Sequence, residues 1–392
     1  MVTDSSRQPA ASFADLDGQP DSTEVRHARL VLSMLGPQIL GYLNDPDVNE
    51  VYVNEDYNIR LDTVNGRRNT HEKITYDQAD VICKTISGIN GKSISPEKPE
   101  LGVELKLLRL RAQLLYPPIT AVPTFFLRKK PRRIFPLEEY VESGALSPAY
   151  FDYLCQCIRQ RKNVIIVGST GSGKTTFLNA VLKKLSELCP EDRLLILEDL
   201  PELQCSSDDV QDLITTGVTD KDITMQKLVF ACMRLSPTRI LIGEVRDKSA
   251  YDVLKAWNTG HPGGYCTLHA DSCEDAFTRL ELLVKDAETS SDTDDIRFLI
   301  GNTVNAIVSI QKRIENGRSR RLVEKILEVE RYDLETHRFV TRTIPRFPDG
   351  DRLDPSGEGS VPKPGASVST VTPHDPPEGG ESSVFENATK HI

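Results

Sequence analysis

The chain has 392 residues, of which 38% are hydrophobic and 27% are charged, and this composition predicts two or three soluble globular domains. Its formal charge of −10 lies mostly at the two ends, because residues 1–24 and residues 345–392 each carry a net charge of −4. The body between them is close to neutral. This argues against a strongly basic nucleic-acid binder, and we expect no direct sequence-specific binding of nucleic acid.

From the sequence we expect neither a membrane-spanning segment nor an export signal. No apolar run approaches the roughly 18 residues that span a bilayer. The acidic N-terminus does not have the basic and then apolar layout of a signal peptide. We therefore expect a cytoplasmic protein that can dock on a membrane complex. Its eight cysteines are not spaced as in a disulfide framework or a zinc site, so scattered thiols are expected.

Both ends are predicted to be disordered tails. Residues 1–25 are rich in Asp, Ser, Pro and Gln. Residues 345–392 contain eight prolines, six glycines and six serines and show no apolar periodicity.

Residues 26–133 are predicted to form a small α+β domain followed by a basic hinge. Apolar residues at helical spacing predict a helix over 27–43, kinked at Gly36-Pro37, and a second helix over 77–88. Strands are expected at 50–53, 59–62, 105–115 and 124–128. The basic run over 128–133 is read as a solvated linker or, alternatively, as a hinge that meets phosphate.

Residues 134–344 alternate strand and helix, which predicts a mostly parallel sheet flanked by helices. Short apolar runs mark buried strands at 164–167, 194–197, 240–242 and 265–268. Two helices and then alternating runs at 306–311 and 322–332 complete this part. The expected fold class is α/β.

A glycine-rich loop carries the strongest functional signal. Residues 168–175 fit G-x-x-x-x-G-K-[ST], follow an apolar strand and open a helix, which is the context expected for a phosphate-binding loop. Lys174 is expected to reach the β- and γ-phosphates of ATP, and the Thr175 hydroxyl to bind Mg²⁺. The expected nucleotide-binding residues of the loop are Gly168, Ser169, Thr170, Gly171, Ser172, Gly173, Lys174, Thr175 and Thr176.

Acidic and histidine side chains follow the neighbouring strands. Glu198 and Glu244 each end an apolar run, and the ends of parallel strands meet beside the phosphate loop. Glu244 is expected to orient or deprotonate the attacking water, and Glu198 to serve the same water or the metal. His269 ends a third strand, so a γ-phosphate contact or a proton relay is expected there.

These segments together resemble one family. The loop, the acidic stretch 196–203, the strand ending in Glu244 and the segment 260–270 look like the Walker A, Asp, Walker B and His boxes of the secretion-superfamily traffic ATPases. Residues 254–264 and 45–54 most resemble its type IV secretion and conjugal-transfer branch.

The resemblance covers roughly residues 28–340. It implies a RecA-like P-loop motor domain preceded by a sensor-like (PAS-like) domain, with ATP bound between the two. It also implies a homo-hexamer at the cytoplasmic face of an inner-membrane secretion or conjugation complex. By match, Arg111 and Arg128 take the positions of arginines that reach the nucleotide phosphates.

Three other interpretations remain open. A pilus-assembly or pilus-retraction motor shares all four boxes. A hexameric helicase would use DNA-binding loops and show DNA-stimulated hydrolysis. A nucleotide-dependent scaffold would not hydrolyse ATP, but intact Lys174, Thr175 and Glu244 argue against it. The expected function is a hexameric ATPase that powers conjugal transfer or type IV secretion, whether DNA or protein translocation or pilus biogenesis.

Overall fold

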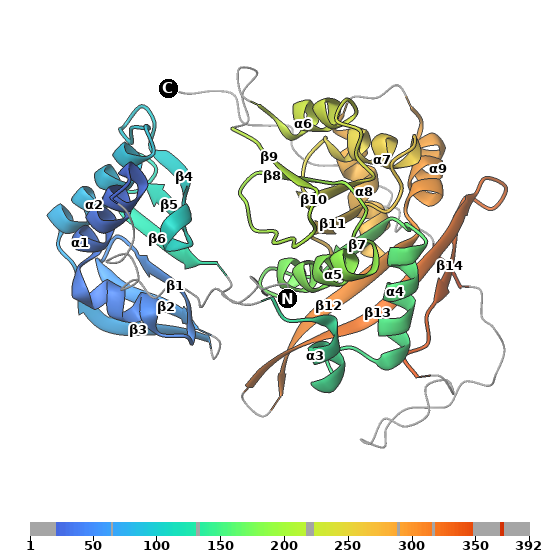
Figure 1. Cartoon of the computed structure of the whole chain (residues 1–392), viewed down its shortest axis with the longest axis horizontal. Coiled ribbons are helices and arrows are strands. Elements are labelled where there is room, and N and C mark those ends of the chain that lie inside the picture. The colour runs from blue at the N-terminus through green and yellow to red at the C-terminus, as the bar shows by residue number, and fades with distance from the viewer. Residues whose placement is uncertain are drawn as a thin grey trace, which may run out of the picture.

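The computed structural model describes residues 21–63, 66–130, 134–216, 223–287, 291–315, 318–347 and 369–371. These residues form a smaller N-terminal unit and a larger C-terminal unit, which lie side by side (Figure 1). The predicted division between the two, in the basic hinge, is at residues 131–133, outside the described residues.

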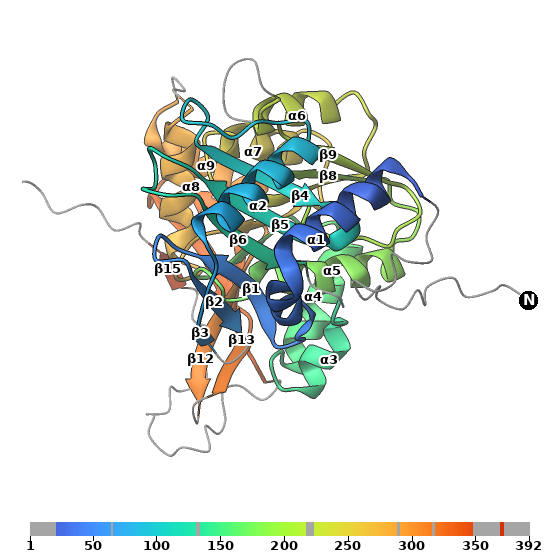
Figure 2. The same cartoon turned by 90° about the vertical axis from the view of Figure 1, so that its left-hand side faces the viewer.

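The N-terminal unit is an antiparallel sheet with two helices on one face (Figure 2). Its strands, in the order β3-β2-β1-β6-β5-β4, are β3 (Gly66–Lys73), β2 (Asn58–Thr63), β1 (Val48–Val53), β6 (Thr124–Lys129), β5 (Leu110–Leu115) and β4 (Glu100–Leu105). Helices α1 (Thr23–Asn44) and α2 (Tyr76–Ile89) bury their apolar stripes on the sheet. Gly36 has non-helical angles (φ 72°) within α1, which is the kink that the Gly-Pro pair predicts.

The structure differs from the sequence prediction at three places in this unit. The run 105–115 was expected to be one strand, but the short helix η2 (Lys106–Leu108) and the left-handed Arg109 (φ 51°) fold residues 100–115 into the β4–β5 hairpin. Strand β3 was not expected, because most of its side chains are exposed and polar. Residues 23–25, expected in the N-terminal tail, form the first turn of α1.

The C-terminal unit is built on one large, mostly parallel sheet, so the predicted α/β fold class is confirmed. Its parallel part runs β9-β8-β10-β11-β7-β12: β9 (Val210–Ile214), β8 (Leu194–Glu198), β10 (Arg239–Val245), β11 (Tyr265–Leu268), β7 (Val164–Val167) and β12 (Ala306–Glu315). Three antiparallel strands extend it: β13 (Arg318–Asp333), β14 (Arg338–Thr343) and β15 (Ser369–Val371). Strand β15 belongs to a segment expected to be a disordered tail.

Helices cover both faces of this sheet, because the buried strands alternate their side chains between two cores. Ile165 and Val167 face the core that contains α6 (Met225–Cys232), α7 (Ala250–Asn258), α8 (Asp275–Lys285) and α9 (Thr293–Thr303). Val164 and Ile166 face the core of α3 (Leu137–Glu142), α4 (Pro148–Arg159) and α5 (Lys174–Leu188). In the described part of the chain, no helix is both long and apolar enough to cross a membrane.

Candidate active site

The phosphate loop connects the end of β7 to the start of α5, as the motif predicts. Two of its glycines are required, Gly168 by lack of space and Gly173 by its backbone conformation. A Cβ atom on Gly168 would lie 2.3 Å from the carbonyl oxygen of Ile310, and one on Gly173 would lie 2.9 Å from Cδ of Arg321. Gly173 also has a left-handed φ of 99°, which disfavours any other residue. The loop is therefore held tightly against β12 and β13.

The polar groups at the loop suit an anion. Helix α5 begins at Lys174 without a side-chain cap, so the first-turn N–H groups and the positive end of the helix dipole are directed at the loop. The hydroxyl of Ser172 is buried and has no hydrogen-bond partner among the described residues. A bound phosphate would satisfy groups of this kind. Thr175 and Thr176 lie half-buried in the first turn of α5, and Ser169, Thr170 and Gly171 are exposed in the loop.

Lys174 is folded back onto its own loop. Its Nζ donates to the carbonyl oxygens of Gly168 (2.8 Å) and Ser169 (3.2 Å) and lies 3.2 Å from Nδ1 of His269. Burial lowers the pKa of Lys174, and the charge of Glu244 opposes this. The ammonium therefore lies at the loop, where its hydrogen bonds go to neutral carbonyl oxygens that phosphate oxygens could replace.

His269 links Lys174 to Glu244. Its Nε2 lies 2.7 Å from Oε1 of Glu244. Burial and the neighbouring Lys174 lower the pKa of His269, and Glu244 opposes them. An ammonium can only donate, so Nδ1 of a neutral imidazole accepts from Lys174 and the ring proton on Nε2 is donated to Glu244. The structure therefore brings three of the predicted catalytic residues into one hydrogen-bonded chain.

Glu198, the fourth predicted catalytic residue, is buried at the end of β8 and holds a loop. Its Oε1 accepts from the backbone N–H groups of Glu202 and Leu203, both at 2.9 Å. A Cβ on Gly243 would lie 3.0 Å from the Glu198 carboxyl, so the glycine before Glu244 makes room for it. Burial raises the pKa of Glu198 to about 7, and the two backbone hydrogen bonds oppose the rise.

Arg111 reaches the C-terminal unit at the loop that Glu198 holds. Its Nη1 lies 2.6 Å from Oε1 of Glu202, so it pairs with a carboxylate in this structure. Asn179 of α5 fixes the same loop, because its amide accepts from Gln204 N (2.8 Å) and donates to Glu202 O (3.2 Å). Sequence reasoning assigned no role to Glu202 or Asn179, since neither ends a strand or belongs to the phosphate-loop motif.

Arg128 is the register partner of Arg111 on the neighbouring strand β6, so it shares the sheet face from which Arg111 reaches Glu202 of the C-terminal unit. It is exposed, and Glu50 lies opposite it on β1. Burial raises the pKa of Glu50, and the charges of Arg128 and Arg111 oppose the rise. The two arginines expected to reach nucleotide are thus neighbours on one face. Their roles, like those of the other predicted site residues, stay predictions.

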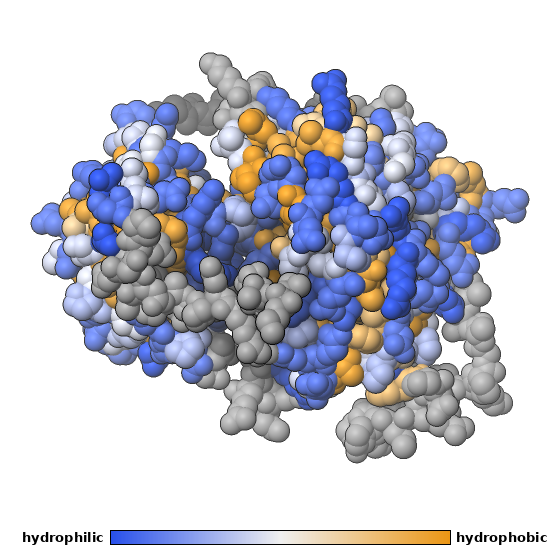
Figure 3. Space-filling model, viewed as in Figure 1, coloured by the Kyte–Doolittle hydropathy of each residue, from blue (hydrophilic) through white to orange (hydrophobic). Residues whose placement is uncertain are grey.

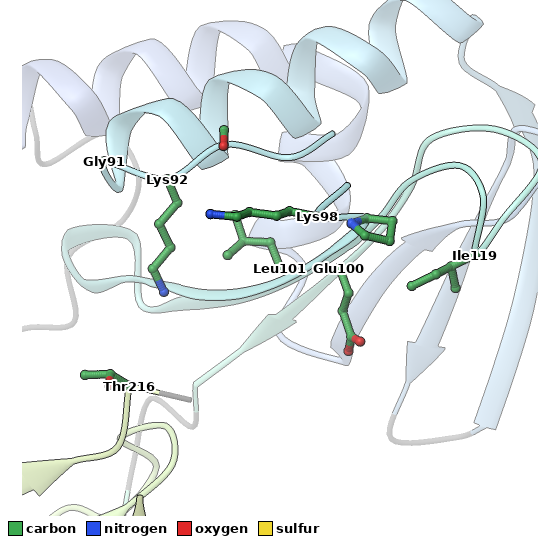
Figure 4. Close-up of a pocket in the computed structure, with 9 residues that line it drawn as sticks. Gly91, Lys92, Lys98, Glu100, Leu101, Ile119 and Thr216 are labelled. Atoms are coloured by element: carbon green, nitrogen blue, oxygen red, sulfur yellow. The ribbon is translucent and has the colours of Figure 1, made fainter. Parts of the chain in front are cut away.

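Two further observations concern other ligands. No group of three or more His, Cys, Asp or Glu side chains in the described residues is arranged to hold a metal ion. A pocket of about 640 Å³ lies between the N-terminal unit and Thr216 of the C-terminal unit, with Lys92, Lys98 and Glu100 on one side (Figure 4). None of the predicted site residues lines this pocket.

Comparison with known proteins places the chain in a family. Residues 95–332 match the family described as Type II/IV secretion system protein. The chain is 37% identical over 309 residues to a probable conjugal transfer protein TrbB of Sinorhizobium fredii, covering 78% of this chain and 91% of that protein. It is 29% identical over 326 residues to the type IV secretion system protein VirB11 of Bartonella quintana, covering 73% and 90%.

A solved structure supports the fold. The X-ray structure of the ATPase DotB from Legionella pneumophila matches with a TM-score of 0.53 and 20% identity, over 82% of this chain and 85% of that one. The resemblance seen in the sequence boxes is therefore confirmed: the chain belongs to the Type II/IV secretion system protein family.

Proposed function

We propose that this chain is an ATPase that powers conjugal transfer or type IV secretion, working as a homo-hexamer at the cytoplasmic face of the inner membrane. The observation that carries the proposal is the hydrogen-bonded chain from Lys174 through His269 to Glu244 at the phosphate loop. The choice of process rests on relatives that are named for conjugal transfer and type IV secretion and align over about three quarters of the chain.

Glu244 is the general base in this proposal. Its carboxylate accepts the proton of the water that attacks the γ-phosphate, and the imidazole of His269 holds the carboxylate in place through the Nε2 proton. Lys174 exchanges its loop carbonyls for phosphate oxygens and places a positive charge on the β- and γ-phosphates. Mg²⁺, when bound with ATP, would neutralise phosphate charge, and the Thr175 hydroxyl is the residue proposed to hold it.

The N-terminal unit is proposed to close over the nucleotide. Arg111 and Arg128 stand side by side on the sheet face turned toward the C-terminal unit, and paired guanidinium donors suit phosphate oxygens.

The surface over α6 is proposed to bind other subunits or partner proteins. Figure 3 shows apolar surface in this region, and its exposed apolar side chains include Ile223, Phe230, Met233 and Leu235.

Two variants test the proposal, each assayed for ATP hydrolysis by the protein and for mating transfer or secretion in cells. Lys174→Ala should abolish turnover because it removes the phosphate charge. Glu244→Gln should keep ATP affinity and lower kcat by about 10²- to 10⁴-fold, because the amide keeps the shape and loses the base. In cells, both variants should abolish mating transfer or secretion. Glu335→Gln, an exposed carboxylate on the β13–β14 turn, is the matched control and should behave as wild type.

Other outcomes would refute parts of the proposal. Normal ATP turnover in Lys174→Ala would refute the assignment of residues 168–175 as the phosphate loop. Loss of ATP binding with normal residual turnover in Glu244→Gln would make Glu244 structural. Hydrolysis that rises steeply on adding DNA alone would favour the helicase interpretation. Loss of surface pili with intact transfer would favour a pilus motor.

A further inference from the structure

Strand β13 brings a cation to the phosphate loop that the sequence motifs do not include. The Nε of Arg321 donates to the carbonyl oxygen of Gly171 at 3.3 Å. Its Cδ is the atom nearest to a Cβ built on Gly173. In the sheet, β12 and β13 lie on one side of β7, and β11 and β10 lie on the other. The loop after β7 is therefore flanked by Arg321 on one side and by His269 and Glu244 on the other.

The charge of Arg321 is not neutralised by a carboxylate in the described part of the chain. Arg313, on the same hairpin, forms an ion pair with Glu324 at 2.7 Å. Arg321 has only the Gly171 carbonyl as a hydrogen-bonded neighbour in the described residues, and its side chain is exposed. A guanidinium carries five N–H donors in a fixed fork, so most of its donors remain available beside a loop that suits anions.

We infer that Arg321 is a nucleotide-binding residue that contacts a phosphate group of ATP from the β13 side of the loop. This inference rests on the proposed function, since it deepens the same site. The hydrogen bond to Gly171 holds the guanidinium against the loop, which reduces the side-chain entropy that a phosphate contact would otherwise cost. Strand β13 would thereby gain a contact when phosphate is bound at the loop and lose it when the phosphate leaves.

Equilibrium binding to the full chain tests the inference. A fluorescent ATP analogue reports affinity, and inorganic tripolyphosphate is used as a competitor that carries phosphates without base or sugar. Arg321→Ala should weaken the affinity for both by the same factor, about tenfold or more for a lost charged hydrogen bond. Arg321→Lys should restore part of the loss. Arg313→Ala removes an arginine from the same hairpin and should bind as wild type.

Three results decide against the inference or its basis. Wild-type ATP affinity in Arg321→Ala overturns it, whatever happens to the melting temperature. Weaker ATP binding with unchanged tripolyphosphate affinity also overturns it, because Arg321 would then contact the base or sugar. Lys174→Ala distinguishes failure of the proposed function from failure of the inference about Arg321. If the folded wild-type chain binds neither probe, the proposed function fails. If wild type binds, Lys174→Ala does not and Arg321→Ala binds normally, only this inference fails.

Discussion

The ion pair between Arg111 and Glu202 should compete with nucleotide for the same guanidinium. The two side chains remain 35% and 31% exposed, so solvent screens the pair and it contributes less than about 1 kcal/mol. Glu202→Gln removes the charge that holds Arg111. If Arg111 binds phosphate as proposed, ADP affinity should rise by up to about fivefold, the factor that corresponds to about 1 kcal/mol.

A double-mutant cycle measures this coupling. ADP is titrated into wild type, Glu202→Gln, Arg111→Ala and the double variant, because ADP binding is not disturbed by hydrolysis. The gain in ADP affinity from Glu202→Gln should disappear in the Arg111→Ala background, since that variant has no guanidinium to release. Glu335→Gln again provides a carboxylate control. Both single variants should melt near the wild-type temperature, as expected for a half-buried pair that solvent still screens.

Two results would refute this reasoning. An equal gain in both backgrounds would mean that the charge of Glu202 acts on the nucleotide directly and not through Arg111. No gain in either background would mean that the pair does not compete with nucleotide at all.

Three further predictions concern single residues. Arg128→Ala should lower ATP turnover while the melting of the C-terminal unit stays unchanged, and unaltered kinetics would return Arg128 to the solvated-linker interpretation. The pKa of Glu198 is raised to about 7 in the folded chain, so the native state keeps a proton that the unfolded state loses above about pH 4.5. The free energy of unfolding should therefore fall by up to about 3 kcal/mol from about pH 4.5 to about 7, and urea titrations of Glu198→Gln should lack that contribution. Arg239→Met removes the buried partner of the Asp192 carboxylate, which is 1% exposed, lies 2.5 Å from Nε of Arg239 and keeps the partly exposed Arg161 at 2.7 Å. Denaturant titration should show a loss of stability below the about 3 to 5 kcal/mol expected for a buried charge left without any partner. Adding Asp192→Leu should recover part of that loss, and a stable single variant would contradict the estimate.

The phosphate loop and the buried strands could be predicted because their signals are local. The loop 168–175 is contiguous, and its context of strand and helix follows from a few neighbouring residues. The parallel strands are short apolar runs because both of their faces are buried. Their ends then bring Glu244 and His269 together, since parallel strands share one carboxyl edge.

The missed features depend on contacts between distant residues. Strand β9 at one edge of the large sheet has two adjacent exposed side chains and no fully buried one, so no alternation marks it. Arg321 follows Lys174 by well over a hundred residues, and its contact with the loop depends on the register of the β12–β13 hairpin. The pairing of Arg111 with Glu202 depends on how the two units meet, which no local pattern in either segment describes.

One connected set of hydrogen bonds joins the nucleotide site to the N-terminal unit. Helix α5 presents Lys174 to the loop at its first residue and Asn179 to the 202–204 segment slightly more than one turn later. Glu198 holds the same segment from β8, so Glu202 is fixed from two elements before it meets Arg111. A shift of α5 on phosphate binding would therefore reach the N-terminal sheet through backbone-anchored groups. In the proposed function, this path is the physical route by which phosphate binding at the loop would move the N-terminal unit without a direct contact between Lys174 and that unit, and the double-mutant cycle at Arg111 and Glu202 measures its last step.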